Sequence, residues 1–353
     1  MAESDRGENS EYDEYAEYRD YGVSDGCRAT FLKWVVLPSW LLLAALVFVF
    51  GFVRAYDVSV PPEYRYIPFL VSIVVFGLPH GAVDHLVPAR LRDERPDLRS
   101  VGRVVVAYTV LVVAYAAVWF VLPAFGFAFF IALTLYHWGQ GDLHASLAFL
   151  RTNVDSRVGR AATLLARGSL PMLAPLVFFP GEYEEVADVV IGVFDPRGAS
   201  SVAFAFEPPF GVAVLAFLFA ACAATVYFSR SAFEAGELLL LGVYFATVPP
   251  VLAIGFYFCF WHSTRHIARL VALDPVASEH VESGEATGAF VRFVRDATPL
   301  TVGALVVFGG LWYAASPPLT LEGFFAVYLV LLAALTLPHA GVVTLMDRAQ
   351  RVW

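Results

Sequence analysis

Ten apolar segments, separated by short polar connections, make up most of the 353-residue chain. Most of them have about the 20 residues that a helix needs to cross the hydrocarbon core of a bilayer. Only 16% of the residues are charged, compared with roughly 25% in a typical soluble domain. The sequence therefore predicts an all-α, polytopic transmembrane helical bundle of about ten spans. We place the segments at residues 31–53, 67–87, 104–123, 125–149, 161–179, 209–228, 236–248, 250–272, 299–315 and 322–346.

Arginine is distributed unevenly among the connections between these segments. The connection between the second and third segments carries Arg90, Arg92, Arg95, Arg99 and Arg103, whereas the turns at 122–126 and 316–323 carry none. Alternate connections follow this bias along the chain. Because cytoplasmic loops are enriched in Lys and Arg, we expect both termini in the cytoplasm and a multi-pass protein of the cell membrane.

The N-terminal 30 residues differ from the rest of the chain. They contain nine acidic and three basic residues and almost no aliphatic ones, so they cannot bury enough surface to fold. We predict that residues 1–30 form an acidic, disordered cytoplasmic tail. The acidic tail and loops, with Lys33 as the only lysine, also indicate a halophilic host, and no nucleic-acid partner is expected.

Histidines are concentrated in the apolar segments, where an ionisable side chain is costly and usually functional. They lie in the second, fourth, eighth and tenth segments, which all run from outside to inside if ten spans alternate. At about 1.5 Å per residue their depths overlap, so four helices can direct imidazoles at one point. The seven histidines in these segments are His80, His85, His137, His144, His262, His266 and His339.

The spacing within each segment indicates which of these histidines share a helical face. His262 and His266 are four residues apart, a spacing suited to two ligands of one metal. His80 and His85 are about 140° apart on an ideal helix and are not expected to ligate the same ion. Four histidine-bearing segments predict a metal site, and neutral imidazole suits Fe, Zn and Cu.

Two carboxylates lie next to these histidines. Asp84 precedes His85, and Asp142 follows His137 by five residues. Either could fix an imidazole by accepting its N–H, or could instead cap a helix or pair with an arginine. Arg265 is a candidate partner for one of them.

The motifs GLPHGAVDH (77–85), YHWGQGD (136–142), WHSTRH (261–266) and LPHAG (337–341) together resemble those of the Brp/Blh family. The members of that family are membrane β-carotene 15,15′-dioxygenases that make retinal for rhodopsins. The resemblance covers roughly residues 61–346, in the family's order, and implies a transmembrane catalytic domain over residues 31–353.

The resemblance implies a non-haem Fe(2+) centre and the cleavage of β-carotene by O2 into two molecules of all-trans retinal. Carried over motif by motif, the metal ligands and catalytic residues are His80, His137, His262 and His266. His85 and His339 would support the site through hydrogen bonds, unless one of them replaces a ligand. A rhodopsin that receives the retinal, and the surrounding membrane lipid, would be the partners.

Aromatic residues adjoin the histidine motifs, namely Tyr136, Trp138, Tyr257 and Trp261. They could line a slot for the flat polyene, or serve only as interfacial and packing residues. The alternatives for the whole chain are a membrane electron-transfer protein with histidine-ligated haem or metal, and a related enzyme that cleaves another carotenoid.

Overall fold

The computed structural model describes residues 21–58 and 61–353, and every regular element in these ranges is a helix. Six helices in these ranges are long and apolar enough to cross a membrane, as expected for an all-α membrane protein. They are the continuous helix formed by α2 (Asp25–Phe31), η1 (Leu32–Val36) and α3 (Leu37–Ala55), and the helices α7 (Leu98–Val121), α9 (Arg157–Phe178), α11 (Pro208–Ser229), α16 (Ala286–Ala315) and α17 (Leu321–Ala349).

The four remaining apolar segments are shorter, interrupted or partly polar. Helix α8 (Pro123–Ala148) is long enough to span, but its second half carries His137, Gln140, Asp142 and His144. Helix α12 (Ala232–Thr247) has only 16 residues and ends just before the break expected at Pro249–Pro250. The other two segments, 67–87 and 250–272, are interrupted helices. The count of ten spans therefore stays a prediction.

The segment 67–87 is broken into α4 (Ile67–Val74), α5 (Gly77–Gly81) and, after a turn, α6 (Val87–Arg90). A Cβ at Gly77 would lie 2.4 Å from the Ser72 carbonyl oxygen, so the chain can turn here only with glycine. Irregular backbone at membrane depth is tolerated where protein covers it, and Leu78 and Pro79 are buried. This break turns the α5 backbone into the centre of the bundle.

The segment 250–272 contains a π-helical turn. It consists of α13 (Pro250–Tyr257), the π-helix η4 (Phe258–Ser263) and α14 (Thr264–Leu273). A π-turn accommodates an extra residue within a helix and is frequent at functional sites. The motif WHSTRH begins inside this turn and continues into α14.

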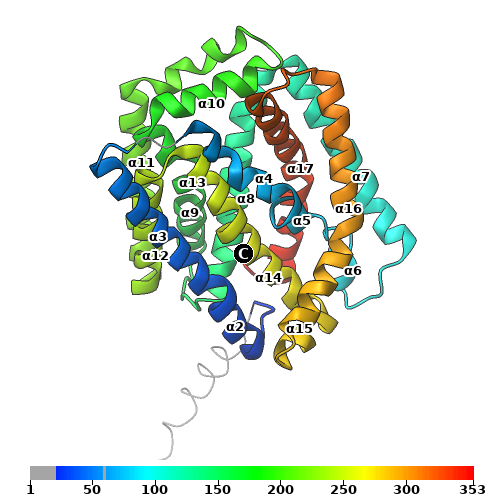
Figure 1. Ribbon diagram of the computed structural model, residues 1–353. Coiled ribbons are helices and arrows are strands. Elements are labelled where there is room, and N and C mark those ends of the chain that lie inside the picture. Colours follow the sequence, from blue (N-terminus) through cyan, green and yellow to red (C-terminus); the bar gives the residue numbers. More distant parts are fainter. Residues whose placement is uncertain (1–20, 59–60) are drawn as a thin grey trace, which may run out of the picture.

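Helices α8 and α17 pack against each other in the middle of the bundle (Figure 1). Helix α9 packs on α8, α11 and α12 on one side, and α7 and α16 pack on α17 on the other. One end is covered by α10 (Pro180–Gly192) and the 3-10 helix η3 (Gly198–Phe206). The 3-10 helix η2 (Pro62–Tyr66) precedes α4.

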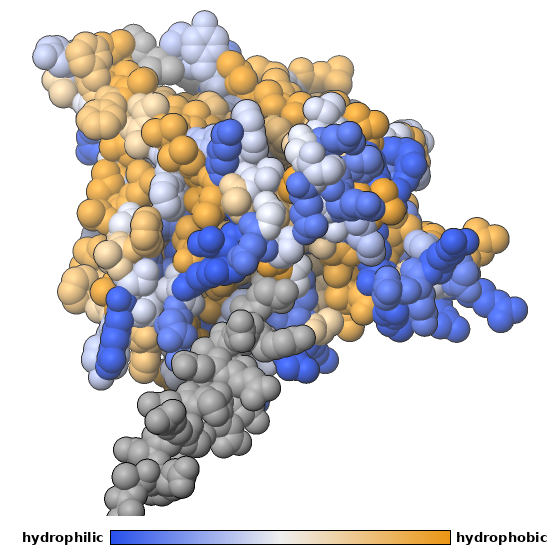
Figure 2. Space-filling model, turned by 90° about the horizontal axis from the view of Figure 1, so that it is seen from below, coloured by the Kyte–Doolittle hydropathy of each residue, from blue (hydrophilic) through white to orange (hydrophobic). Residues whose placement is uncertain are grey.

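The opposite end carries α2, α6, α15 (Pro275–Glu282) and the C-terminus (Figure 1). Hydrophilic residues gather on this end, as Figure 2 shows. Arg90 forms ion pairs with Asp274 at 2.5 Å and Asp296 at 2.6 Å, and Arg160 donates to the Val352 carbonyl oxygen at 2.7 Å. The connections that carry Arg90 and Arg160 thus lie at the same end of the bundle as the C-terminus.

Residues 1–20 of the predicted disordered tail, which was placed at residues 1–30, lie outside the described residues. Its last part differs from the prediction, because residues 25–30 belong to α2. Ser24 caps this helix, Cys27 and Phe31 are buried, and Arg28 donates to the Phe149 carbonyl oxygen at 2.9 Å. The acidic composition of residues 1–30 as a whole does not reveal this short amphipathic helix.

Close packing of α8 on α9 yields a test of the fold. A Cβ at Gly168 would lie 1.9 Å from the Leu135 carbonyl oxygen, so Gly168→Ala must push the two helices apart. We expect the free energy of unfolding to fall by about 1–3 kcal/mol, the usual cost of overpacking. Thermal unfolding in detergent measures the effect. Gly236→Ala on α12 is the control, because nothing lies within 4 Å of an added Cβ there; equal melting temperatures of the two variants would contradict the packing.

Candidate active site

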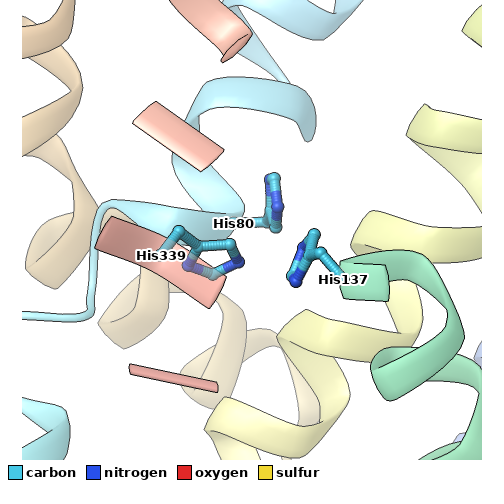
Figure 3. A group of neighbouring side chains, drawn as sticks. All are labelled: His80, His137 and His339. Carbon is cyan, nitrogen blue, oxygen red and sulfur yellow. The ribbon is translucent and has the colours of Figure 1, made fainter. Parts of the chain in front are cut away.

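Five histidine rings meet at the centre of the bundle. They are His80 of α5, His137 of α8, His262 of η4, His266 of α14 and His339 of α17. In nine of the ten ring pairs the centroids lie 4.6 Å (His137–His339) to 6.5 Å (His262–His266) apart, and each residue is less than a tenth exposed. Figure 3 shows three of these rings converging from three separate elements.

Hydrogen bonds leave ligand nitrogens free in this cluster. His80 donates from Nδ1 to the Gly77 carbonyl oxygen, so its unpartnered Nε2 carries the lone pair. His339 donates from Nδ1 to Asp84 at 2.6 Å, with the same consequence for its Nε2. The Nε2 atoms of His137 and His262 lie 3.0 Å apart, and neither His266 nitrogen has a hydrogen-bond partner. Buried polar atoms without partners are rare and call for a ligand or ion.

The geometry is compatible with a metal. One ligand nitrogen from each of His80, His137 and His339 lies within 4.8 Å of the other two. A second such group consists of Asp84, His266 and His339. A donor set of neutral imidazoles fits iron, zinc or copper. The sequence predicted a supporting role for His339, and its ring lies 5.0 Å from that of His80, 4.6 Å from that of His137 and 4.9 Å from that of His266.

Asp84 acts on the cluster through His339. Its Oδ2 accepts hydrogen bonds from both His339 Nδ1 and the Tyr108 hydroxyl, and the carboxylate is fully buried. A carboxylate that accepts the second ring N–H fixes the tautomer and orientation of an imidazole. This is the role that the sequence suggested for Asp84. Tyr108 was not foreseen, because nothing in α7 distinguishes it from a packing tyrosine.

Asp142 contacts arginine and aromatic residues instead of a histidine of the cluster. It accepts hydrogen bonds from Trp261 Nε1 at 3.0 and 3.1 Å and from the Tyr257 hydroxyl at 3.3 Å. Arg167 lies 3.4 Å from this carboxylate and Arg265 lies 3.8 Å from it. Of the two interpretations left open by the sequence, pairing with arginine is the one that the structure shows.

Asp142 belongs to a buried ion network that joins four helical segments. Arg167 of α9 binds Glu234 at 2.7 Å and Glu237 at 2.6 Å, both on α12, and Arg265 of α14 binds Glu237 at 2.6 Å. The Arg265 guanidinium also lies 3.7 Å over the Trp261 ring. The network thereby fixes the helix that presents His262 and His266. Sequence reasoning missed Arg167, Glu234 and Glu237, although charges inside apolar segments are a signal in themselves.

Two of the seven histidines in the apolar segments lie outside the cluster, His85 and His144. His85 is half-buried and donates from Nδ1 to the Ala82 carbonyl oxygen at 3.0 Å. Charged groups near it include Asp84 of the site as well as Arg90 and Asp296, and the supporting role predicted for His85 stays a prediction. His144 packs on Phe149 and contacts the Tyr21 carbonyl oxygen at 3.4 Å. His85 lies in the turn between α5 and α6, beyond the end of the helix that carries His80.

A cavity of about 750 Å³ opens beside the cluster, and His80, His137 and His339 form part of its wall. Most other lining residues are aliphatic or aromatic. Of the four aromatics predicted to line a slot, only Trp138 does so. Tyr257 and Trp261 point to Asp142, and Tyr136, which is 38% exposed, lies next to Gln140 and Thr344. Polar atoms on these three side chains drew them to polar partners instead of the apolar cavity.

A model of the β-carotene 15,15′-dioxygenase family matches residues 71–347, which include every histidine of the cluster. The chain belongs to the β-carotene 15,15′-dioxygenase family. It is 43% identical over 336 residues to the probable β-carotene 15,15′-dioxygenase Blh of Halobacterium salinarum, covering 92% of this chain and 93% of that protein.

More distant relatives carry related names. The probable β-carotene 15,15′-dioxygenase Brp of Halobacterium salinarum is 29% identical over 340 residues, covering 89% of this chain and 91% of that protein. The β-carotene 15,15′-dioxygenase of an uncultured marine bacterium is 24% identical over 277 residues, covering 76% and 90%. No solved structure matches the chain. The resemblance to the Brp/Blh family, a class of carotenoid-cleaving dioxygenases, is thereby confirmed.

The ion network can be tested at its centre. Glu237→Ala removes the carboxylate that binds both Arg167 and Arg265 at 2.6 Å, and breaking a buried ion pair on one side costs about 3–5 kcal/mol. We expect a lower melting temperature and less bound metal, because α14 loses its attachment to α12. Melting temperature and metal content of the purified variant provide the measurement. Glu184→Ala on α10, an exposed position, is the control, and a Glu237→Ala protein as stable as this control would refute the role of the network.

Proposed function

We propose that the chain cleaves the central double bond of β-carotene with O2 and releases two molecules of all-trans retinal. The observation that carries this proposal is the arrangement of the cluster and the cavity. Buried imidazoles with free nitrogens form the wall of an apolar cavity in a protein whose relatives are named β-carotene 15,15′-dioxygenases.

The proposed metal is Fe(2+), held by His80, His137, His262 and His266. The fit rests on the donor set, since imidazole nitrogens suit iron and each of these rings keeps a buried nitrogen without a hydrogen-bond partner. Iron supplies the reaction with O2, which the amino-acid side chains cannot perform. His339 is the fifth imidazole of the cluster, oriented by Asp84.

The protein's own contribution is to place the polyene and keep water away. Along α17 the cavity wall runs from Phe325 to His339, a rise of about 21 Å at 1.5 Å per residue. On α8 it runs from Phe127 to Trp138. His339 lies at one end of the lining residues of α17, and His137 lies next to one end of those of α8. An elongated apolar molecule can therefore lie along the helices with its reacting bond at the histidines.

Membrane location follows from the same physics, because a carotenoid dissolves in the bilayer. We propose a multi-pass protein of the cell membrane with about ten spans. The arginine-rich polar end, which carries the C-terminus and α2, would face the cytoplasm. Retinal released into the bilayer would be available to a rhodopsin, and the acidic composition fits a halophilic host.

The activity is tested by expressing the chain in cells that make β-carotene and extracting their pigments. We expect the wild type to lose carotene and gain retinal, and His262→Ala to leave carotene unchanged. If the folded, iron-loaded wild type leaves β-carotene intact, the substrate assignment fails, and assays with other carotenoids or of electron transfer would follow.

Iron content separates the histidines from one another. We expect His80→Ala and His266→Ala to lose iron, because they remove ring nitrogens of the cluster, and His85→Ala to retain it. Iron per mole of purified protein is the measurement. Iron retention in His80→Ala with loss in His85→Ala would overturn the assignment.

Asp84 can be tested without touching a ring of the cluster. In Asp84→Asn the His339 Nδ1–H loses its carboxylate acceptor, and such changes lower metal affinity or activity by roughly 10–100-fold. We expect weaker iron binding, measured by competition with a chelator. Tyr108→Phe is the matched control, since it removes the other hydrogen bond to Asp84 and leaves the carboxylate–imidazole pair in place. Equal affinities in wild type and Asp84→Asn would exclude this role.

A further inference from the structure

We infer that the long apolar substrate enters sideways from the bilayer, through an opening between α7 and α16. This inference rests on the proposed function and adds the route of the substrate.

The exposed part of the cavity wall belongs entirely to these two helices. Among the residues that line the cavity, those more than a third exposed all lie on α7 or α16. On α7 they include Val105, Thr109, Val113 and Ala117, which recur every four residues and so form one stripe along the helix. Every lining residue from the other elements is buried or half-buried. The cavity therefore communicates with the outside along one seam.

Helix α16 faces the seam with small residues. Gly303 and Gly310 line the cavity, are exposed, and have no atom within 4 Å of an added Cβ. The space in front of them is therefore not filled by side chains of the described protein. Helices α7 and α16 lie next to each other on one side of the bundle (Figure 1), yet each packs mainly on other helices, notably α17.

The seam faces the region that lipid would occupy. Only 17% of the most apolar window of α7 and 11% of that of α16 is buried, compared with 67% in α9. Among the six long apolar helices these two are the least covered by protein. A molecule dissolved in hydrocarbon meets this opening directly and does not have to cross a polar surface.

The opening extends to the depth of the histidines. Tyr108, next to Thr109 in the exposed stripe, also lines the cavity and donates to Asp84, which holds His339. The unpartnered Nε2 atoms of His80 and His339 are buried, and both residues form part of the cavity wall. The route from lipid therefore ends at atoms that call for a ligand.

The test uses iron-loaded full-length protein in lipid nanodiscs that contain β-carotene. Gly303→Trp and Gly310→Trp place a large side chain in the seam, and Gly309→Trp is the matched control. Gly309 is exposed and has nothing within 4 Å of an added Cβ, but it does not line the cavity. We expect kcat/KM to fall by roughly tenfold or more in the two seam variants, as expected when access is obstructed, and to stay near the wild-type value in Gly309→Trp.

A second measurement separates obstruction of the route from loss of iron or fold. Iron content and melting temperature of the seam variants are expected to match the wild type. Kinetics of Gly303→Trp and Gly310→Trp equal to those of Gly309→Trp, with an active wild type, would overturn the inference. So would an equal loss in all three variants. An inactive wild type would instead refute the proposed function, and the entrance together with it.

Discussion

The arrangement of the bundle depends on how charge is accommodated away from water. Glu237 binds two arginines, Arg167 and Arg265, and the resulting network holds α8, α9, α12 and α14 together. A charged side chain alone in hydrocarbon is so costly that it must find a partner of opposite charge. In this network the partners of each charged residue lie on helices other than its own. The requirement of charge pairing thus dictates which helices are neighbours. The ion network thereby also positions the histidines of η4 and α14.

Candidate site residues could be predicted from the sequence where a polar residue lies within an apolar segment. Four histidine-bearing segments predicted a metal site, and the resemblance to the Brp/Blh family assigned its ligands to His80, His137, His262 and His266. The structure brings these four rings and that of His339 together. The contacts of a polar residue were harder to predict where several partners were available. Asp142 lies close to His137 in the sequence, but only the packing of α9 and α12 reveals that arginines and Trp261 surround it.

Segment lengths predicted a helical membrane protein, but they could not reveal which segments are interrupted. The break after Val74 depends on the close approach of Gly77 to the Ser72 carbonyl oxygen, a contact with no counterpart in hydropathy. The position of His339 is a related case, because the motif predicted only that it supports the site, and the packed helices bring its ring next to those of His80 and His137. In both cases tertiary contacts decide, and a single sequence does not contain them explicitly.

The π-turn in η4 changes the directions in which the side chains before and after it point. Each residue rotates an α-helix by about 100°, so one extra residue offsets everything before the turn from everything after it by about that angle. Val251 and Ile254 of α13 line the cavity, while Arg265 of α14 reaches the ion network. The two halves therefore follow different helical phases along one continuous axis. Deleting a single residue between 258 and 261 would put them in phase and turn one of these surfaces away from its partners.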